Sequence, residues 1–258
     1  MVKRQRPHAR IMHDKGLIAR LREIKADHPF WGYRRLWAHL RFVDQILVNK
    51  KRIRRLVCEN NLGVSANTRL RAKRTPQRSK PRPNVPNQWW GIDMTKVMTR
   101  SGHAYVVLVL DWYTKKLVGH YVGVQSKAEH WLEALERAVQ RQCPNGSRDC
   151  NISLMSDNGC QPTSAAFMAR CRRLGIQQAF TSYNNPKGNA DTERMVRTMK
   201  EELLWLYDWG SSDDVAKALD AWAEKYNNQY LHSTLKYKTP CSVEQLFFQQ
   251  HETPLMVA

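Results

Sequence analysis

The sequence predicts an α/β domain built around a mixed five-stranded sheet, preceded by a small all-helical module. Three observations lead to this prediction. Apolar residues recur at helical spacing before residue 69, a basic Pro-rich stretch follows, and from Trp89 strand-like and helix-like runs follow in the order β-β-β-α-β-α-β-α. We therefore expect five parts: a basic lead (1–15), a helical module (16–68), a linker (69–88), an α/β core (89–210) and a C-terminal helical segment (211–258).

Three short helices account for the apolar residues of the helical module. The first ends before the His28-Pro29 pair, because proline disfavours a helical residue before it. The second covers GYRRLWAHL, and the third begins after Asn49, a favourable N-cap residue, and stops near Gly63. Three short helices with a basic last one are typical of a helix-turn-helix-like DNA-binding module. Their expected apolar positions are Leu17, Leu21, Ile24, Tyr33, Leu36, Leu40, Ile53, Leu56 and Val57.

Positive charge is concentrated at the start of the chain. The net charge is +19, and residues 1–88 hold 23 of the 42 Lys and Arg but 5 of the 23 Asp and Glu. Double-stranded DNA is the expected partner, since each neutralised phosphate releases counterions; a merely solvated basic surface is the alternative. The candidate DNA contacts, to phosphates rather than to base edges, are Arg34, Arg35, Lys50, Lys51, Arg52, Arg54 and Arg55.

The linker holds hardly any apolar residue and cannot fold alone, so it is either a passive spacer or a segment that orders along DNA. After it we expect three antiparallel strands and then two more, with a Ser126-to-Glu129 capping box opening the first helix. The expected strands are 89–97, 104–112, 115–124, 151–156 and 176–181. The expected helices are 126–142, 164–174, one around Glu193, one from Ser212 and one at 241–250.

Composition argues against several classes of protein. No run of about 20 apolar residues exists, and no apolar segment follows the basic start, so we expect neither a membrane span nor a signal peptide. The six cysteines form no CxxC pair, which argues against a structural zinc site. We expect free thiols, Cys143 and Cys150 included, in a cytoplasmic protein that is found where the DNA is.

Three carboxylates are the candidate catalytic and metal-binding residues. Asp93 and Asp157 each follow a strand-like apolar run, and Glu193 lies on a helix, with 35 residues between Asp157 and Glu193. Such carboxylates suit Mg²⁺ or Mn²⁺, which prefer oxygen ligands. Two ions about 4 Å apart, present when DNA is bound, would act on the attacking and leaving oxygens of a phosphodiester. The pattern predicts a metal-dependent polynucleotidyl transferase.

Neighbouring polar residues are candidates for contacts near this site. Arg197 and Lys200 lie about 40° and −20° from Glu193 around the helix, so all three share one stripe. Lys200 suits a phosphate or a base near the scissile bond, and a solvated stripe is the alternative for both cations. Asn158 is a further candidate contact and, with Gly159, is expected to shape the loop that turns Asp157 inward.

Four other polar residues are weaker candidates. We expect Asp111 to cap the turn into Tyr113-Thr114 rather than to bind a metal. Asp191 faces about 200° away from Glu193 on its helix and is not expected to be a ligand. His103 and His232 are more readily explained by structural roles than by chemistry.

These residues carry a resemblance. The Asp93, Asp157 and Glu193 set, with Lys200 seven residues further on, resembles the DDE signature of insertion-sequence transposases and retroviral integrases. The surrounding motifs HPFWGYRRLWAHL, WWGIDMTKV, SDNGCQPTS, NPKGNADTERMVRTMKEE and YNNQYLHSTLKYKTP are similar to the second-frame (OrfB) catalytic product of bacterial two-frame insertion sequences. The similarity runs from about residue 15 to 245.

The resemblance implies a ribonuclease-H-like core, Mg²⁺ or Mn²⁺, and cleavage and joining at the terminal inverted repeats of a bacterial element, often through a circular intermediate. It also implies a target DNA, a dimer or higher assembly on DNA, and a place on the nucleoid when DNA is bound. Two departures from the pattern stand out: the His/His/Cys/Cys zinc module of retroviral integrases is missing, and so is the helix-turn-helix and zipper region of the first-frame product.

Two other functions stay open at the level of sequence. The chain could be a DNA-binding regulator or assembly partner that needs fusion to the first-frame product for activity. It could also be a ribonuclease H or a structure-specific nuclease on the same fold. The complete carboxylate set argues against the first, and the basic module and the wide Asp157–Glu193 spacing argue against the second.

Overall fold

The computed structural model describes residues 8–64, 81–181 and 188–251, with side chains from residue 14 onward except those of 147 and 149. The chain divides into two compact units, Met1–Lys73 and Arg74–Ala258, each of which is described by itself. Most of the predicted linker (to residue 80) and most of the predicted loop at 182–189 therefore lie outside the described residues. None of the helices in the described ranges is long and apolar enough to cross a membrane.

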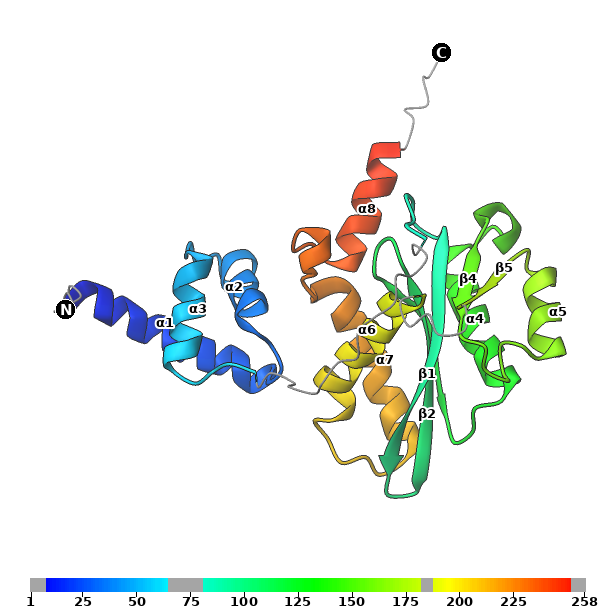
Figure 1. Cartoon of the computed structure of the whole chain (residues 1–258), viewed down its shortest axis with the longest axis horizontal. Coiled ribbons are helices and arrows are strands. Elements are labelled where there is room, and N and C mark those ends of the chain that lie inside the picture. The colour runs from blue at the N-terminus through cyan, green and yellow to red at the C-terminus, as the bar shows by residue number, and fades with distance from the viewer. Residues whose placement is uncertain (1–7, 65–80, 182–187, 252–258) are drawn as a thin grey trace, which may run out of the picture. The chain divides into compact units, whose positions relative to one another are not determined.

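Within residues 8–64 the first unit contains three helices (Figure 1): α1 (His8–Asp27), α2 (Tyr33–Phe42) and α3 (Lys50–Glu59). The Asn49 side chain accepts a hydrogen bond from the Lys51 backbone, which confirms the predicted N-cap. Two predictions are wrong. The helix already starts at His8, because residues 8–15 continue the helical run that was assigned to a basic lead, and α3 ends at Glu59 rather than near Gly63. The aliphatic positions predicted to be apolar are all buried; Tyr33 is half-buried.

The second unit is built on a mixed five-stranded sheet, as predicted. Its strands are β1 (Trp89–Thr99), β2 (Gly102–Asp111), β3 (Leu117–Gly123), β4 (Ser153–Ser156) and β5 (Gln177–Phe180), in the spatial order β3-β2-β1-β4-β5. The first three strands are antiparallel neighbours, whereas β4 runs parallel to β1 and β5 parallel to β4. This order places β1 at the centre of the sheet, next to β4.

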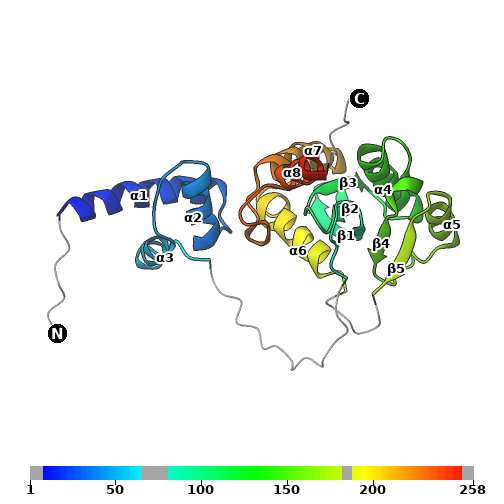
Figure 2. The same ribbon diagram turned by 90° about the horizontal axis from the view of Figure 1, so that it is seen from above.

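Helices cover both faces of this sheet (Figure 2). On one side lie α4 (Ala128–Gln142) and α5 (Ala165–Arg173); on the other lie α6 (Ala190–Met199), α7 (Ser212–Gln229) and α8 (Pro240–His251). Residues alternate between faces along a strand, so Trp90 and Ile92 join the apolar core under α4 and α5, whereas Gly91 faces α6. Asp93 therefore points to the same side as Gly91, toward the layer that contains Glu193.

Two local predictions in this unit are wrong. Helix α4 begins at Ala128 with Lys127 as its N-cap; Ser126 does not cap it, because its hydroxyl accepts a hydrogen bond from the Trp131 indole. Cys143 and Cys150 form a disulfide instead of free thiols. The turn after Cys143 and the short 3₁₀ helix Ser147–Cys150 fold the chain back, which brings the two Cα atoms to 6.6 Å. Among the described residues the other four cysteines are free.

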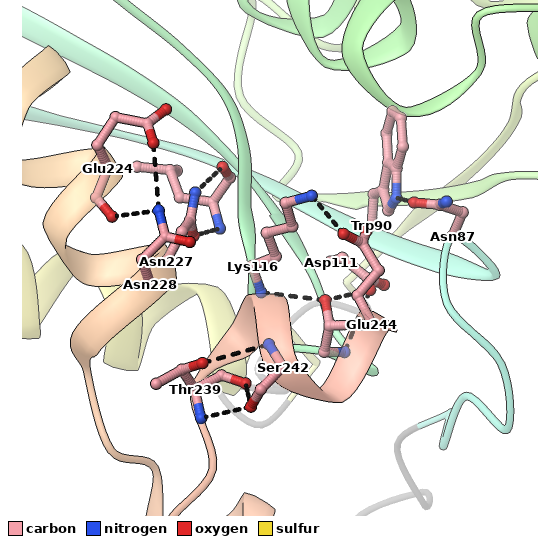
Figure 3. Close-up of polar contacts among 12 residues, drawn as sticks. Asn87, Trp90, Asp111, Lys116, Glu224, Asn227, Asn228, Thr239, Ser242 and Glu244 are labelled. Carbon is pink, nitrogen blue, oxygen red and sulfur yellow. Dashed lines mark hydrogen bonds and ion pairs between the residues drawn. The ribbon is translucent and has the colours of Figure 1, made fainter. Parts of the chain in front are cut away.

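The C-terminal helices are tied to the start of β3 (Figure 3). The Asn227 amide on α7 accepts a hydrogen bond from the Leu117 backbone N–H (2.9 Å) and donates one to the Leu117 carbonyl (3.0 Å). On α8, Glu244 forms an ion pair with Lys116 at 2.5 Å. Helix α7 is thus part of the same packed body as the sheet, and Asn227 satisfies two backbone groups in a buried position that water does not reach.

We predict that Asn227→Ala lowers the free energy of unfolding by about 2–4 kcal/mol, because it leaves a buried backbone donor and acceptor without partners. Asn228→Ala is the matched control: Asn228 is exposed and bonds only to Glu224 of its own helix, so a change below about 0.5 kcal/mol is expected. Urea unfolding of both variants tests this. Equal losses in the two variants would mean that Asn227 does not join α7 to the sheet.

Candidate active site

Two of the three candidate carboxylates are brought together by neighbouring parallel strands. In the ladder between β1 and β4, Trp89 lies opposite Ser153, Trp90 opposite Leu154 and Gly91 opposite Met155. Continuing this register by two residues places Asp93 level with Asp157, the first residue after β4. The parallel pairing therefore explains why carboxylates 64 positions apart in the sequence lie side by side, where β4 ends beside β1.

The third carboxylate comes from α6, which crosses β1 at Gly91. A Cβ atom at residue 91 would lie 1.9 Å from the Thr192 hydroxyl oxygen, so only glycine allows the helix to pack this closely. Glu193 directly follows Thr192, and Asp93 is the next residue after Gly91 on the same face of β1. Sequence reasoning missed Gly91, although a glycine inside a strand is a known signal of close backbone approach.

The electrostatics of Asp93 indicate that the charged residues share one neighbourhood. Burial is the largest influence and raises the pKa of Asp93 to about 6, while a hydrogen bond from the Met94 backbone N–H opposes the increase. The negative charges of Asp157 and Glu193 raise this pKa further, and the positive charge of Lys200 lowers it. Asp157 and Glu193 are themselves exposed, so the site borders solvent.

The arrangement fits divalent cations by its donor chemistry. Three carboxylates that repel one another are stabilised by bound cations, and their oxygens are the ligands that hard metal ions prefer. Within residues 8–64, 81–181 and 188–251, however, no three Asp, Glu, His or Cys side chains lie close enough together to form a ready metal-binding group. Coordination by all three carboxylates would therefore require them to draw closer than they are in this structure.

The two cations predicted beside Glu193 have different surroundings. Arg197 is largely exposed and pairs with Glu201 at 2.7 Å, one helical turn further on. Lys200 is half-buried and close enough to influence Asp93. It is also the first residue of a π-helical turn, Lys200–Leu204, that continues α6, and such turns are frequent at functional sites.

The loop after β4 is held by its own polar residues. The Asn158 side-chain amide donates a hydrogen bond to the Thr181 carbonyl at the end of β5 (2.7 Å), and the Gly159 backbone N–H donates to the Asp157 carboxylate (3.0 Å). These contacts show that Asn158 and Gly159 hold the loop around Asp157, although Asp157 is exposed rather than turned inward as predicted.

The two weaker carboxylate candidates, Asp111 and Asp191, each have structural partners. Asp111 is buried and accepts hydrogen bonds from Tyr113 and Thr114, which confirms the predicted turn cap. Asp191 forms an ion pair with Lys115 at 2.8 Å. Both residues of this pair line a pocket of about 510 Å³ that includes none of the three candidate carboxylates.

The two histidines pack against aromatic rings. His103 lies against Tyr105 of β2, and His232 contacts the rings of Tyr226 and Tyr230. These ring contacts are in keeping with structural roles for both histidines.

In the helical module, the structure separates the predicted basic contacts into two groups. Arg52 and Arg55 of α3 were predicted to be exposed, but both pair with Asp14 of α1, at 2.7 and 2.9 Å. Asp14 is buried, and sequence reasoning missed it because its partners are 38 and 41 residues away. These two arginines therefore join α1 to α3.

The other predicted basic contacts surround aromatic side chains. Arg34 and Arg54 lie on the Tyr33 ring, 5.6 and 5.9 Å from its centroid, and Lys50 lies over Trp37 at 4.2 Å. Arg34, Lys51 and Arg54 are exposed, whereas Arg35 and Lys50 are half-buried. Cations held in place on aromatic rings at an exposed helix surface are suited to phosphate binding.

Comparisons with known proteins agree with this architecture. Two family models, each described as "Integrase core domain", match residues 83–186 and 174–240, and a third, "HTH-like domain", matches residues 9–71. The cryoEM structure of a simian T-cell lymphotropic virus intasome, in complex with PP2A regulatory subunit B56 gamma, contains a similar chain. That match has a TM-score of 0.55 and 16% identity, and it covers 92% of this chain and 76% of the other. The likeness shows a shared ribonuclease-H-like fold.

Similar sequences include a Mycobacterium tuberculosis (strain H37Ra) protein named "Putative transposase for insertion sequence element IS986/IS6110". It is 28% identical over 263 residues, which cover 96% of this chain and 94% of that protein. A Shigella sonnei protein named "Transposase for insertion sequence element IS629" is 26% identical, over 93% of this chain and 82% of that protein.

We predict that Asp14→Asn destabilises the helical module by about 1–3 kcal/mol at pH 7, because it removes the charge that pairs with Arg52 and Arg55. Burial opposes ionisation of Asp14, but hydrogen bonds from Arg55 and Arg52 leave its pKa below the usual value. The wild-type advantage should therefore be complete above the ordinary Asp pKa of about 4 and be lost as the pH falls through the lowered value.

The matched control for this prediction is Asp27→Asn, an exposed residue at the end of the same helix. Thermal unfolding of wild type and both variants between pH 3 and 8 measures the difference. A pH-independent gap between wild type and Asp14→Asn would contradict the pairing.

Proposed function

We propose that this chain, which belongs to the insertion-sequence transposases with an integrase core domain, uses Asp93, Asp157 and Glu193 to cleave and join DNA at the terminal inverted repeats of its element. Transposition of DNA follows from the family; the residue roles are the proposal. The observation that carries it is the meeting of two parallel strands and one helix at a solvent-accessible point, where Asp157, Glu193 and Lys200 all influence Asp93.

The three carboxylates are the residues that would hold the divalent cations, Mg²⁺ or Mn²⁺, with two ions per site when DNA is bound. When bound, such ions polarise the scissile phosphate and lower the pKa of the attacking water or 3′-hydroxyl. Burial first and the negative charges of Asp157 and Glu193 second raise the pKa of Asp93; this supports the assignment, since bound cations would offset both effects.

Neighbouring side chains would orient the DNA. Lys200 offers a half-buried point charge beside Asp93 for a phosphate or base next to the scissile bond. Arg197 is exposed on the same helix and would contact the backbone further away, in competition with its partner Glu201. Asn158 acts through the loop that it holds around Asp157.

The helical module would supply the remaining binding energy for the element ends. Arg34, Lys51 and Arg54 are the exposed residues among its predicted DNA contacts, while Arg52 and Arg55 stabilise the module itself. Phosphate contacts of this kind give affinity that depends strongly on salt. Since two ends and a target must be held together, we propose a dimer or higher assembly on DNA, with the first-frame product as a further candidate partner.

A regulator without catalysis of its own is the less favoured function. All three carboxylates and Lys200 are present, and the similarity to named transposases extends over nearly the whole chain. The same relatives argue against a ribonuclease H, because their similarity includes the region of the basic module.

We predict that Asp157→Asn binds duplexes carrying the element's own ends with wild-type affinity but cleaves them at least about 1000-fold more slowly, because one ligand of the proposed metal site is lost. Labelled duplexes incubated with Mg²⁺ or with EDTA measure nicking and joining. Asp111→Asn is not a suitable control, since Asp111 caps a turn. The control is Asp213→Asn, which changes an exposed carboxylate of α7.

Three outcomes of this assay are informative. Cleavage by wild type that needs metal and is lost in Asp157→Asn supports the proposal. Equal cleavage by the variant would rule out Asp157 as a ligand. Binding without cleavage by the wild type would favour a requirement for the first-frame product.

We predict that the double variant Lys51→Ala/Arg54→Ala binds DNA more weakly and that the slope of log K against log salt becomes shallower by about 2, because two phosphate contacts are lost. Lys217→Ala/Lys225→Ala removes the same charge from exposed positions of α7 and should leave the slope nearly unchanged. Fluorescence anisotropy at several salt concentrations measures both slopes. Identical slopes in the two double variants would place the main DNA surface outside α3.

A further inference from the structure

The contact between α6 and β1 contains a set of buried polar residues that the proposed chemistry does not use. The Trp112 indole N–H donates a hydrogen bond to the Thr192 hydroxyl at 3.0 Å, across 80 residues of sequence. The Asn189 side-chain amide donates to the Ile92 carbonyl at 3.2 Å. All four residues are buried. Buried polar side chains are costly unless they are paired, so such a set needs a reason to exist.

We propose that Asn189, Thr192 and Trp112 form an anchor that fixes the position of Glu193 relative to Asp93. They are positioning residues: each acts through the contact between α6 and β1, and none touches DNA. This inference rests on the proposed function, because it explains how two of the proposed metal ligands are held in register.

The anchor is adjacent to both carboxylates in the chain. Thr192 immediately precedes Glu193, and Ile92, whose carbonyl accepts the Asn189 bond, immediately precedes Asp93. A shift of α6 along β1 would break both hydrogen bonds at once. The anchor therefore resists the motion that would change the separation of the two carboxylates.

Two further contacts make the anchor rigid. The Trp112 backbone N–H donates to the Trp89 carbonyl at 2.9 Å, and the two indole rings stack with centroids 5.8 Å apart. Trp112 is thereby fixed to the first residue of β1. On the other side, Gly91 leaves no space between the strand and the helix, since a Cβ there would lie 2.4 Å from the Trp112 indole nitrogen and 2.8 Å from the side-chain amide oxygen of Asn189.

A purely structural role is the competing explanation. The residues could simply hold α6 on the sheet and contribute stability, as any buried hydrogen bond does. The two explanations differ in what a minimal change should affect. Loss of positioning lowers the rate of the chemical step and the affinity for metal, whereas loss of stability lowers the unfolding temperature alone.

The test uses the full-length protein and Thr192→Val, which keeps the shape of the side chain but removes the acceptor for the Trp112 indole. At saturating DNA we expect single-turnover cleavage to slow by about 10- to 100-fold, because a small misplacement of catalytic groups has that effect. DNA affinity should stay within about twofold of wild type. Thr192→Ser restores the hydroxyl and should recover most of the rate.

A second readout does not depend on cleavage. Titration with Mn²⁺, followed by the EPR signal of the free ion, should show that Thr192→Val weakens metal affinity by about 10-fold, as is typical when residues behind the ligands are changed. The control is Thr198→Val, another buried threonine of α6 that lies about 1.7 turns further along the helix. It should change neither the cleavage rate nor the Mn²⁺ affinity by more than about twofold.

The possible outcomes distinguish failure of the anchor from failure of the proposed function. Wild-type Mn²⁺ affinity and cleavage in Thr192→Val, or equal losses in Thr198→Val, would overturn the anchor while leaving the three carboxylates as the proposed ligands. Failure of Thr192→Ser to recover the rate would also overturn it. A wild-type protein that neither binds Mn²⁺ nor cleaves DNA, under conditions where it binds the duplex, would overturn the proposed function together with the anchor.

Discussion

The close contact between α6 and β1 is the constraint on which the candidate site depends. A helix can lie directly on a strand only where the strand lacks a side chain, and Gly91 provides that position. The side chains of β1 alternate between faces, so the same geometry that admits α6 at residue 91 also directs Asp93 toward it. Glu193 could not share a site with Asp93 if residue 91 were larger.

The sheet topology supplies the other half of the site. Asp157 reaches Asp93 because β4 pairs in parallel with the central strand and ends just before the acid. The longer antiparallel strands β2 and β3 lie on the opposite side of β1, so the side that faces β4 is taken by the parallel pairing. The two candidate carboxylates are thus brought side by side by backbone pairing, with no local sequence motif that joins them.

Much of the fold and of the candidate site could be predicted, because short stretches of sequence determine it. The strand that contains Asp93, the strand that ends just before Asp157 and the N-cap at Asn49 are short-range signals, and the structure agrees with them. Pairings between distant residues leave no such signal. Asp14 with Arg52 and Arg55, Trp112 with Thr192, and the disulfide between Cys143 and Cys150 each depend on how the chain folds back. The basic residues of α3 accordingly looked equivalent in the sequence, although only some of them face solvent.

The candidate site combines charged groups that repel one another with uncharged contacts that hold the surrounding backbone in place. Three neighbouring carboxylates cannot define their own geometry, because like charges favour separation until cations bind. The geometry must then come from contacts that carry no net charge. Backbone pairing of β1 with β4 and the indole, hydroxyl and amide bonds between α6 and β1 meet this requirement. Their strength does not vary with metal occupancy or with salt, so the carboxylates can remain near one another before cations and DNA arrive.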